Sequence, residues 1–402
     1  MANVSSSNGL EKRPKLRFPG FDEPYKQYRI SDIYAERSQR GASDMELLSV
    51  TMNDGVVPRS EIEGKDNSSE DKSNYKVVLK GDMVYNSMRM WQGANGISPC
   101  DGIVSPAYTV LMPKNQISNG YFAALFKSPN LINQFRKNSQ GMTSDTWNLK
   151  YPQIAPIKVC LPTLTEQEKI ADMLGTLDKR IARQTQLVDS LKKYKRGVMQ
   201  RIFRQTATQE GEVWSCVRLG DVFKKISRRN TNGMVKNVIT NSAEYGLIPQ
   251  RDFFDKDIAV DGNTANYYII EEGDFVYNPR KSNTAPYGPF NRYTLSERGI
   301  ISPLYTCLVL QADINPSYLA WYFRSDAWHR YIYDNGSQGV RHDRVSMTDD
   351  LLMGIPVMFP DRTKQLLYAE TLDKIEVRLQ AAQKEYELLV SMKDGCVQQL
   401  FI

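Results

Sequence analysis

The sequence predicts an α+β protein in which two α/β domains, related by internal duplication, are joined by two long helices that form an antiparallel coiled coil. Three observations favour this class: a long segment occurs twice, both copies carry a heptad pattern, and the two globular stretches share short motifs in the same order. At 402 residues the chain is long enough for two or three domains.

The repeated segment runs from Pro162 to Phe203 and again from Pro360 to Phe401, and every residue of the second copy stands 198 positions after its counterpart. Apolar residues recur in both copies at alternating steps of three and four, the spacing of a coiled-coil seam. A long helix with one narrow apolar stripe needs a cover in water, and the other helix is the nearest cover. We expect a coiled coil about 58 Å long, from ~39 residues at ~1.5 Å each.

The predicted seam has one set of apolar residues on each helix. The seam residues are Ile170, Leu174, Leu177, Ile181, Val188 and Leu191 in the first copy and Tyr368, Leu372, Ile375, Leu379, Tyr386 and Leu389 in the second. The alternative is that each helix packs on its own domain as an ordinary amphipathic helix. The narrow stripe and a register kept over about five heptads favour the coiled coil.

Changes in composition place the domain boundaries. The opening residues are small, polar and basic, and they are too poor in apolar side chains to fold unaided. The predicted parts are a disordered leader (1–16), a first domain (17–161), a central long helix (162–206), a second domain (207–359) and a C-terminal long helix (360–402).

The two domains share four short motifs in the same order. The matching pairs are Arg29–Tyr34 with Arg218–Phe223, Gly81–Asn86 with Gly273–Asn278, Gly102–Tyr108 with Gly299–Tyr305, and Ser139–Gly141 with Ser337–Gly339. Gly-Asp and Ser-Pro pairs before β-branched and aromatic residues are typical of turns that lead into short strands. We interpret the motifs as a common scaffold.

Between these motifs the two copies differ completely. The loops hold Arg, Asn or Gln beside aromatic rings, and those side chains contact base edges: Arg with guanine, Asn or Gln with adenine. The candidate DNA-binding residues are Arg89, Trp91, Gln92, Asn95 and Trp147 in the first domain and Arg280, Lys281, Asn283, Tyr287, Arg292, Arg341 and Arg344 in the second. Surface loops without a ligand are the alternative.

Charge is unevenly distributed, although the net charge is only +6. The stretch from Asp178 to Arg204 holds nine Lys or Arg residues against two Asp, whereas Arg362 to Ile402 holds six charges of each sign. A basic helix of this kind is either a solvated face or an electrostatic footprint for nucleic acid or an acidic partner.

Several classes of function are disfavoured by what the sequence lacks. It has no glycine-rich phosphate loop, only two histidines, and five cysteines that stand singly, so we expect a non-catalytic chain that binds no metal or cofactor. No run of 18 apolar residues is present. We therefore expect a cytoplasmic protein with reduced thiols and no membrane partner.

In this order, and occurring twice, the motifs resemble the specificity (S) subunit of type I restriction-modification systems. The likeness extends from Lys15 over nearly the whole chain and includes Leu161–Ile170, which leads into the first long helix. The second copy has Lys364-Gln365 where the family usually has Glu-Gln. We expect that change to weaken a capping interaction at the start of the second helix.

The resemblance implies two target recognition domains, held apart by the helices, that each bind one half of a bipartite, asymmetric sequence in double-stranded DNA. It also implies two methyltransferase (M) subunits that dock on the helices and methylate adenine N6 with S-adenosylmethionine. Restriction (R) motor-nuclease subunits, which use ATP and Mg, would complete the host-defence complex. The alternative class is a non-catalytic protein-protein scaffold without DNA readout, which a salt-dependent binding test would distinguish.

Overall fold

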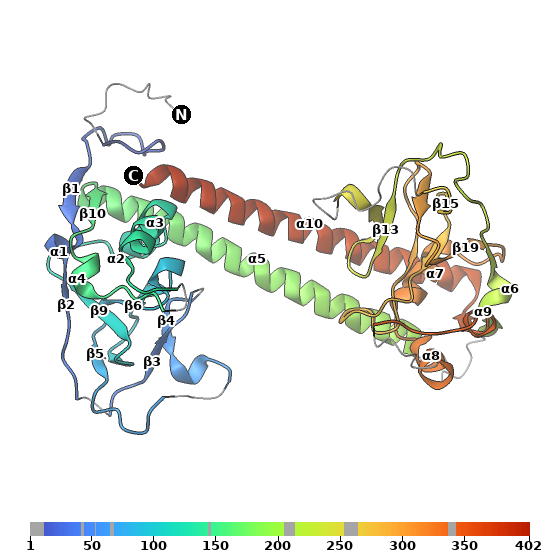
Figure 1. Ribbon diagram of the computed structural model, residues 1–402, viewed down its shortest axis with the longest axis horizontal. Helices are drawn as coiled ribbons and strands as arrows, with labels where there is room; N and C mark the ends of the chain where they lie inside the picture. The colour runs from blue at the N-terminus through green and yellow to red at the C-terminus, as the bar shows by residue number, and fades with distance from the viewer. Residues whose placement is uncertain are drawn as a thin grey trace. The chain divides into compact units, whose positions relative to one another are not determined.

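The computed structural model describes residues 12–402 except 42–43, 53, 65–67, 144–145, 205–213, 253–263 and 337–342. The chain divides into two compact units. Unit 1 comprises residues up to Gln186 together with Gln383–Ile402, and unit 2 comprises Leu187–Ala382. Each long helix is therefore shared between the units (Figure 1). The domain boundaries inferred from composition stay a prediction.

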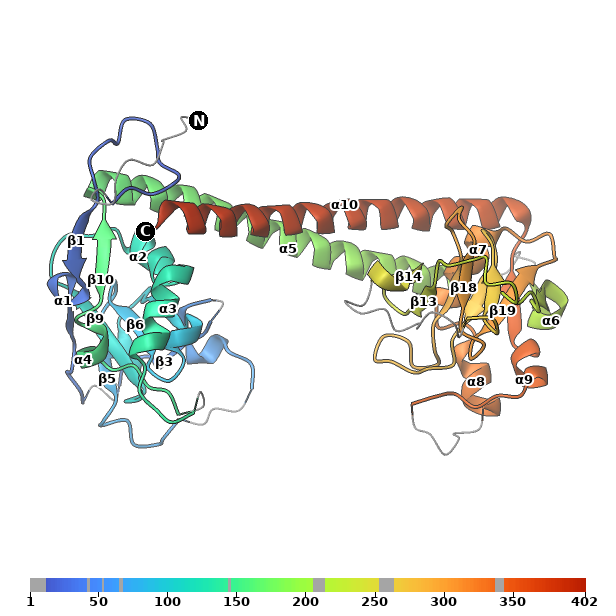
Figure 2. The same ribbon diagram turned by 45° about the horizontal axis from the view of Figure 1, so that its top comes forward.

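Unit 1 is built from short strands, short helices and parts of both long helices (Figures 1 and 2). Its strands are β1 (Lys26–Arg29), β2 (Tyr34–Glu36), β3 (Leu48–Val50), β4 (Val56–Pro58), β5 (Lys76–Val78), β6 (Met83–Asn86), β7 (Asn95–Ile97), β8 (Gly102–Val104), β9 (Tyr108–Pro113) and β10 (Lys158–Leu161). Its helices are α1 (Ile30–Ile33), η1 (Arg59–Glu61), η2 (Met90–Gln92), α2 (Asn119–Leu125), α3 (Pro129–Asn138), α4 (Tyr151–Ile154) and the first part of α5 (Leu164–Arg204).

Unit 2 repeats this sequence of elements except for η2, which has no counterpart in its described residues. Its strands are β11 (Ser215–Arg218), β12 (Phe223–Lys225), β13 (Ile239–Ser242), β14 (Gly246–Pro249), β15 (Tyr268–Ile270), β16 (Phe275–Tyr277), β17 (Phe290–Arg292), β18 (Gly299–Ile301), β19 (Thr306–Leu310) and β20 (Pro356–Phe359). Its helices are α6 (Leu219–Val222), η3 (Gln250–Asp252), α7 (Pro316–Arg324), α8 (His329–Asn335), α9 (Asp349–Met353) and the first part of α10 (Arg362–Leu400).

Sheet topology is the same in both units. A four-stranded antiparallel sheet has the order β2-β9-β6-β7 in unit 1 and β12-β19-β16-β17 in unit 2. Three two-stranded pairs also correspond: β1-β10 with β11-β20, β3-β4 with β13-β14, and β5-β8 with β15-β18. The internal duplication that the motifs indicate is thus present in the backbone, and the predicted fold class is confirmed.

The shared Gly-Asp motif forms the turn before the central strand of each four-stranded sheet. Gly81 and Gly273 adopt φ angles of 92° and 96°, which side chains with a Cβ rarely tolerate. The buried carboxylate of Asp82 accepts a hydrogen bond from the backbone N–H of Leu79 at 2.9 Å, and that of Asp274 makes the matching bond in unit 2. The motif is therefore a scaffold element, as its repetition indicates.

Both buried carboxylates of the Gly-Asp motif also pair with an arginine. Asp82 is 2.6 Å from Nε of Arg37, and Asp274 is 2.6 Å from Nη2 of Arg228. Burial raises the pKa of Asp274 above its ordinary value, and the Arg228 charge opposes that shift. Pairing thus stabilises a charged turn at the base of each sheet.

The seam residues of the long helices are buried or half-buried, and each unit contains its own part of the seam. In unit 1, Ile170 and Leu174 share a core with Leu400. In unit 2, Val188 packs with Leu379. Because α5 meets the end of α10 in unit 1 and its beginning in unit 2, the two helices are antiparallel.

Ion pairs flank this seam. Lys195 of α5 lies 2.7 Å from Glu376 of α10 within unit 2. Within unit 1, Asp178 pairs with Lys393, and Arg180 lies 3.8 Å from Glu385. Part of the basic stretch of α5 therefore faces acidic residues of the other helix.

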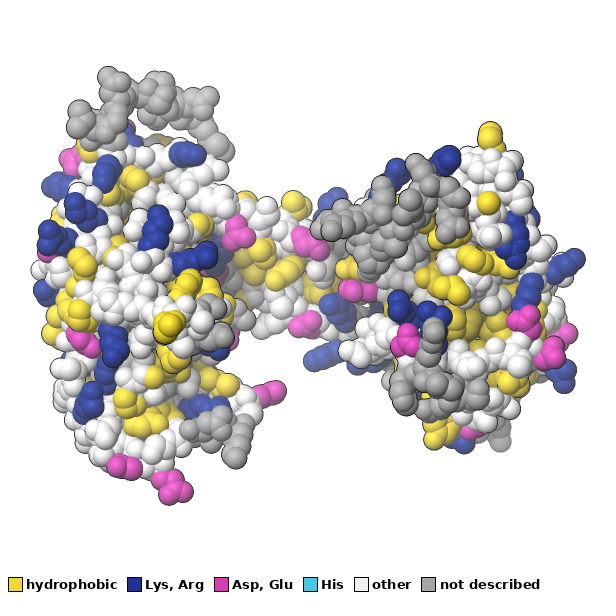
Figure 3. Space-filling model, in the orientation of Figure 1, with side chains coloured by type: hydrophobic (Ala, Val, Ile, Leu, Met, Phe, Trp, Pro, Cys, Tyr) yellow, Lys and Arg dark blue, Asp and Glu magenta, His cyan; other side chains and the backbone are white. Residues whose placement is uncertain are grey.

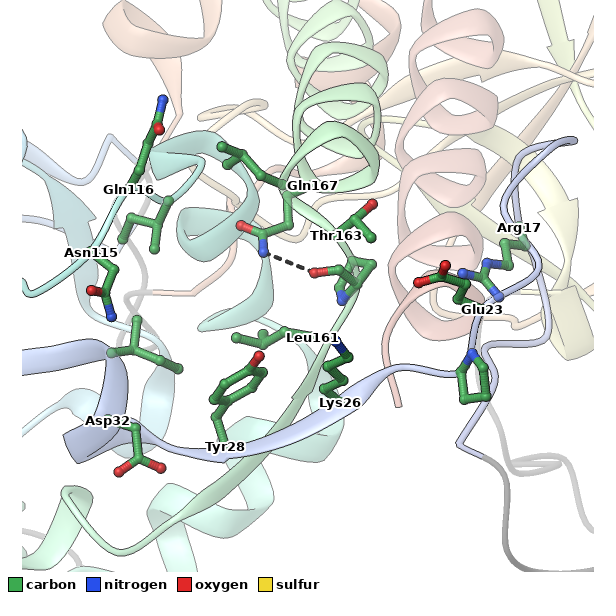
Figure 4. Close-up of a pocket in the computed structure, with 15 residues that line it drawn as sticks. Arg17, Glu23, Lys26, Tyr28, Asp32, Asn115, Gln116, Leu161, Thr163 and Gln167 are labelled. Atoms are coloured by element: carbon green, nitrogen blue, oxygen red, sulfur yellow. Dashed lines mark hydrogen bonds between the residues drawn. The ribbon is translucent and has the colours of Figure 1, made fainter.

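A glutamine ties the start of α5 to the α/β part of unit 1. Gln167 donates from Nε2 to the carbonyl oxygen of Pro162 at 3.2 Å, and its Oε1 accepts from the backbone N–H of Ser118 at 3.3 Å. Figure 4 shows Gln167 and Thr163 at the edge of a pocket that Arg17 also lines. Because Ser118 caps α2, this one side chain connects the first turns of two helices.

The start of α10 has the same connection in unit 2. Gln365 donates to the carbonyl oxygen of Pro360 at 2.9 Å and accepts from the N–H of Asn315, the cap of α7, at 2.8 Å. The helix start is also capped, because Asp361 accepts from the N–H of Lys364 at 3.1 Å. The Asp361 side chain thus supplies one cap, and the expectation that Lys364 weakens a capping interaction stays a prediction.

Glu166, the counterpart of Lys364, binds the chain that precedes β1. It is fully buried, and its two carboxylate oxygens each lie 2.9 Å from a guanidinium nitrogen of Arg17. Tyr25 also donates its hydroxyl to this carboxylate at 3.3 Å. Leu16, at the end of the predicted leader, donates its N–H to the carbonyl oxygen of Gln399, whereas residues 1–11 lie outside the described part of the chain.

We predict that Arg17→Ala destabilises unit 1 by about 3 kcal/mol, because it leaves a buried carboxylate without its cation. The loss is measurable as faster amide hydrogen exchange in unit 1 and a lower urea midpoint. Lys26→Ala is the control, since Lys26 is exposed on β1. Equal stability of the two variants would contradict the role given to the Arg17–Glu166 pair.

Candidate nucleic-acid interface

The loops that differ most between the two copies lie beside a second loop in each unit. In unit 1 the backbone N–H of Leu149 donates to the carbonyl oxygen of Ser87 at 2.8 Å. In unit 2 the N–H of Val345 makes the corresponding bond to the carbonyl oxygen of Pro279 at 2.9 Å. We call residues 87–95 with 140–143 and 146–149 loop surface 1, and residues 279–289 with 343–345 loop surface 2.

Two tryptophans from separate loops meet on loop surface 1. The rings of Trp91 and Trp147 lie 5.1 Å apart at 75°, an edge-to-face contact. Arg136 of α3 places its guanidinium 5.7 Å from the centre of the Trp147 ring. Arg89 and Gln92 are exposed on the same loop, with 3.4 Å between Nη1 of Arg89 and Oε1 of Gln92. These side chains form an aromatic surface with a basic edge.

Asn95 was a candidate for base contact, but the structure places it in the scaffold. It is fully buried on β7, and its side-chain amide donates to the carbonyl oxygens of Gly93 and Phe126 at 3.2 and 3.4 Å. A side chain enclosed in this way presents no surface to a base edge. We therefore do not include Asn95 in the proposed interface.

Loop surface 2 is basic. Arg280 and Arg344 stand opposite each other in an antiparallel bridge, and the N–H of Lys281 donates to the carbonyl oxygen of Asp343 at 2.9 Å. Asn283 is exposed on the tight turn that follows. The bridge thus brings together basic residues that are more than sixty positions apart in the sequence.

Tyr287 connects loop surface 2 to α8. Its ring lies 4.8 Å from that of His329, and its carbonyl oxygen accepts the hydroxyl of buried Tyr277 at 2.8 Å. A surface pocket of about 500 Å³ opens here, lined by Lys281, Tyr287 and Tyr333 among other residues. Figure 3 shows Lys and Arg side chains beside hydrophobic ones on the face of each unit that this view presents.

Of the two remaining candidates, Arg292 does not reach these surfaces and Arg341 cannot be placed against them. Arg292 lies on β17 and donates from Nη1 to the hydroxyl of Ser317 on α7 at 3.3 Å. Its side chain is therefore directed toward a helix of its own unit. Arg341 lies outside the described residues.

Sequence reasoning missed Arg136, His329 and Asp343. Arg136 and His329 stand on helices, and only the tertiary fold brings them to loop residues Trp147 and Tyr287. Asp343 stands next to a basic residue, and its acidic charge gave no reason to expect it at a DNA surface. The one available signal was its place in a loop that differs between the copies.

The described residues give no indication of a metal centre or a membrane span. No group of three or more His, Cys, Asp or Glu side chains in the described ranges is arranged to hold a metal ion. Among the helices described, none combines the length and the apolar character needed to cross a lipid bilayer.

Comparison with known proteins identifies the class. Residues 23–193 match the family model described as the type I restriction modification DNA specificity domain. This stretch, which covers most of the α/β part of unit 1 and much of α5, is similar to that domain. The resemblance to the specificity subunit of type I restriction-modification systems is confirmed, and unit 2 repeats the same topology.

Individual relatives agree with this class. The putative type I restriction enzyme MjaX specificity subunit of Methanocaldococcus jannaschii is 25% identical over 215 residues, or 46% of this chain and 49% of that protein. The match thus spans about half the length of this curated relative. The S subunit of the type I system from M. genitalium has a similar fold, with a TM-score of 0.58 at 13% identity over 97% of this chain and 99% of that one.

A second solved structure comes from work on complex assembly and conformational transition of the type I R-M system. It matches with a TM-score of 0.55 at 14% identity, and covers 96% of this chain and 98% of that one. Likenesses at this level of identity concern the fold alone.

We predict that His329 titrates below its ordinary pKa of about 6.5. Burial beside Tyr287 lowers the pKa of His329, and the Asp326 carboxylate only partly opposes this. Below about pH 6.5, His329 therefore binds a proton more readily in the unfolded state than in the folded state. Unit 2 should lose stability as the pH falls from about 6.5 toward the folded pKa, and above that window the effect should vanish.

Isotope-labelled histidine gives a direct measurement, since the chain contains only His329 and His342. His342→Gln assigns the two resonances, and His329→Gln should reduce the loss of stability at acid pH. A pKa for His329 at or above the ordinary value would contradict the burial argument.

Proposed function

We propose that this chain is the DNA sequence-recognition subunit of a type I restriction-modification complex, in which each unit contacts one half of a bipartite, asymmetric target. One observation carries the proposal: both units join their two variable loops with the same backbone hydrogen bond and present different side chains there. A common frame with unlike contact residues suits a protein that distinguishes two short sequences.

The side chains differ in a way that favours an asymmetric target. Loop surface 1 is mainly aromatic, with Trp91, Trp147 and a single loop arginine, whereas loop surface 2 carries Arg280 and Arg344. Arginine pairs bidentately with guanine, while apolar and aromatic groups suit thymine methyls and sugars. The two half-sites should therefore differ in base composition.

We further propose that the long helices dock two methyltransferase subunits, which carry S-adenosylmethionine and methylate adenine N6, and that restriction subunits using ATP and Mg complete the assembly. On this view the chain itself is non-catalytic. Five apolar side chains on α10 are 43–65% exposed. They support docking, because apolar side chains grouped on a surface mark sites of protein-protein contact. They are Leu366, Leu367 and Val377 in unit 2 and Leu388 and Met392 in unit 1.

The direct test is a selection from random DNA duplexes with the full chain and a methyltransferase subunit, followed by methylome sequencing of a host that carries both. We expect two defined half-sites with adenine methylation in each. Binding that falls with salt but shows no sequence preference would favour the alternative of a protein-protein scaffold.

We predict that the halves can be exchanged separately. Replacing residues 25–161 with the same region of another specificity subunit should alter one half-site and leave the other unchanged. Replacing residues 214–359 is the reciprocal control. If either exchange altered both half-sites in the selected sequences, the units would not act independently.

We also predict that helix length sets the spacing between the half-sites. Inserting three heptads after Gln184 and three more after Ala382 preserves the seam and adds about 32 Å, close to one turn of DNA at ~34–36 Å. The preferred spacer should lengthen by about nine or ten base pairs at ~3.4 Å per step. An unchanged spacer in the same selection would show that the helices do not determine it.

A further inference from the structure

Arg280 and Arg344 form an unusual pair on loop surface 2. They are direct partners in an antiparallel bridge, and opposite residues of such a bridge point to the same side with their Cβ atoms ~4.5–5.5 Å apart. Two like charges in that position destabilise a bridge. The pair is nevertheless solvent-accessible, with side chains 66% and 34% exposed.

Asp343 lies between the two arginines. Its Oδ2 is 3.8 Å from Nε of Arg280 and 3.8 Å from Nε of Arg344. At that separation the carboxylate attracts both cations without a close hydrogen bond to either. Because the three groups sum to a single positive charge, the set still attracts hydrogen-bond acceptors.

The backbone around the set is fixed on both sides. The N–H of Lys281 and the N–H of Val345 connect the two loops, and the side chain of buried Asn278 accepts the N–H of Arg280 at 3.0 Å. Tyr305, from the shared Ser-Pro motif, is electrostatically coupled to the arginines: burial raises its pKa, and both arginine charges lower it. Residues of the shared scaffold therefore hold the backbone of Arg280, Asp343 and Arg344 in place.

These donors and acceptors match a G·C base pair better than a phosphate. Each Nε faces Asp343, which leaves the terminal nitrogens of either guanidinium group to donate to guanine O6 and N7. The free carboxylate oxygen suits the N4 amine of cytosine. A phosphate drawn to the same place would meet the carboxylate, and like charges repel.

We propose that Arg280, Asp343 and Arg344 recognise a G·C base pair in the half-site contacted by unit 2, with Asp343 orienting the two arginines and accepting a hydrogen bond from cytosine. This inference rests on the proposed function. It adds Asp343 and a specific G·C base pair to that function. Variants of Asp343 and Arg280 test both additions, whereas the wild-type chain tests DNA sequence recognition.

The experiment compares variants of the full chain, with its methyltransferase subunit, in selections from random duplexes and in titrations of selected and unrelated duplexes. Arg280→Lys keeps the charge but loses the planar fork, and Asp343→Asn loses the carboxylate. Either variant should reduce the preference for one G·C pair by about 5- to 150-fold, and the other half-site should not change. Asp343→Glu should retain most of the preference.

Asp313→Asn is the control for the loss of one negative charge without any change on loop surface 2. Asp313 is an exposed carboxylate of unit 2 that faces Arg362. Both Asp→Asn variants should bind unrelated DNA slightly more tightly, since each removes one negative charge. Only Asp343→Asn should also reduce base preference.

Three results would overturn the inference. If Asp343→Asn behaved like Asp313→Asn, the carboxylate would position nothing. If Arg280→Lys kept the full preference, Arg280 would act as a point charge on phosphate. A wild-type chain without any sequence preference would instead remove the proposed function, and the inference with it.

Discussion

The structure depends on the covering of two narrow apolar stripes. A helix such as α5 or α10 gains most of its stability by packing its apolar face against another element, so an uncovered stripe would leave it weakly stable in water. Each unit solves this with helical segments from both copies of the repeat, and Ile170 with Leu400 and Val188 with Leu379 are the resulting contacts. The ends of the stripes also join the α/β cores, so the same side chains stabilise the coiled coil and fix where each domain attaches to it.

Within each unit, the features that the two copies share lie in the scaffold, and the features that differ lie in the loops. The Gly-Asp turn and the glutamine at each helix start satisfy buried polar groups in the same way in both units. These bonds leave little freedom, because an unpaired buried donor or acceptor is costly. The two variable loops of each unit are joined to each other by backbone hydrogen bonds, so their side chains can differ without disturbing this connection. That division allows one architecture to carry an aromatic surface in one unit and a basic surface in the other.

Sequence analysis predicted the duplication, the strands after the Gly-Asp turns and the two long helices, because repeats and periodicity are local properties. It also selected Trp91 with Trp147 and Arg280 with Arg344, which the fold brings together. It could not see that Asn95 would turn inward, since a Gly-Ala-Asn-Gly stretch is typical of an exposed turn. The positions of Arg136, His329 and Asp343 depend on contacts between distant segments that no local pattern encodes.

The two copies have diverged where each long helix begins. In unit 1 a buried carboxylate, Glu166, binds Arg17 and Tyr25, whereas in unit 2 Trp214 stacks on Tyr368 at 6.5 Å and 18°. The two arrangements are not interchangeable, because without Arg17 the buried carboxylate of Glu166 would lack its cation. Hybrid subunits made by recombination should therefore fold when the crossover keeps Arg17 and Tyr25 with α5, and Trp214 with α10. Natural recombination between genes of this kind should preserve the same pairings.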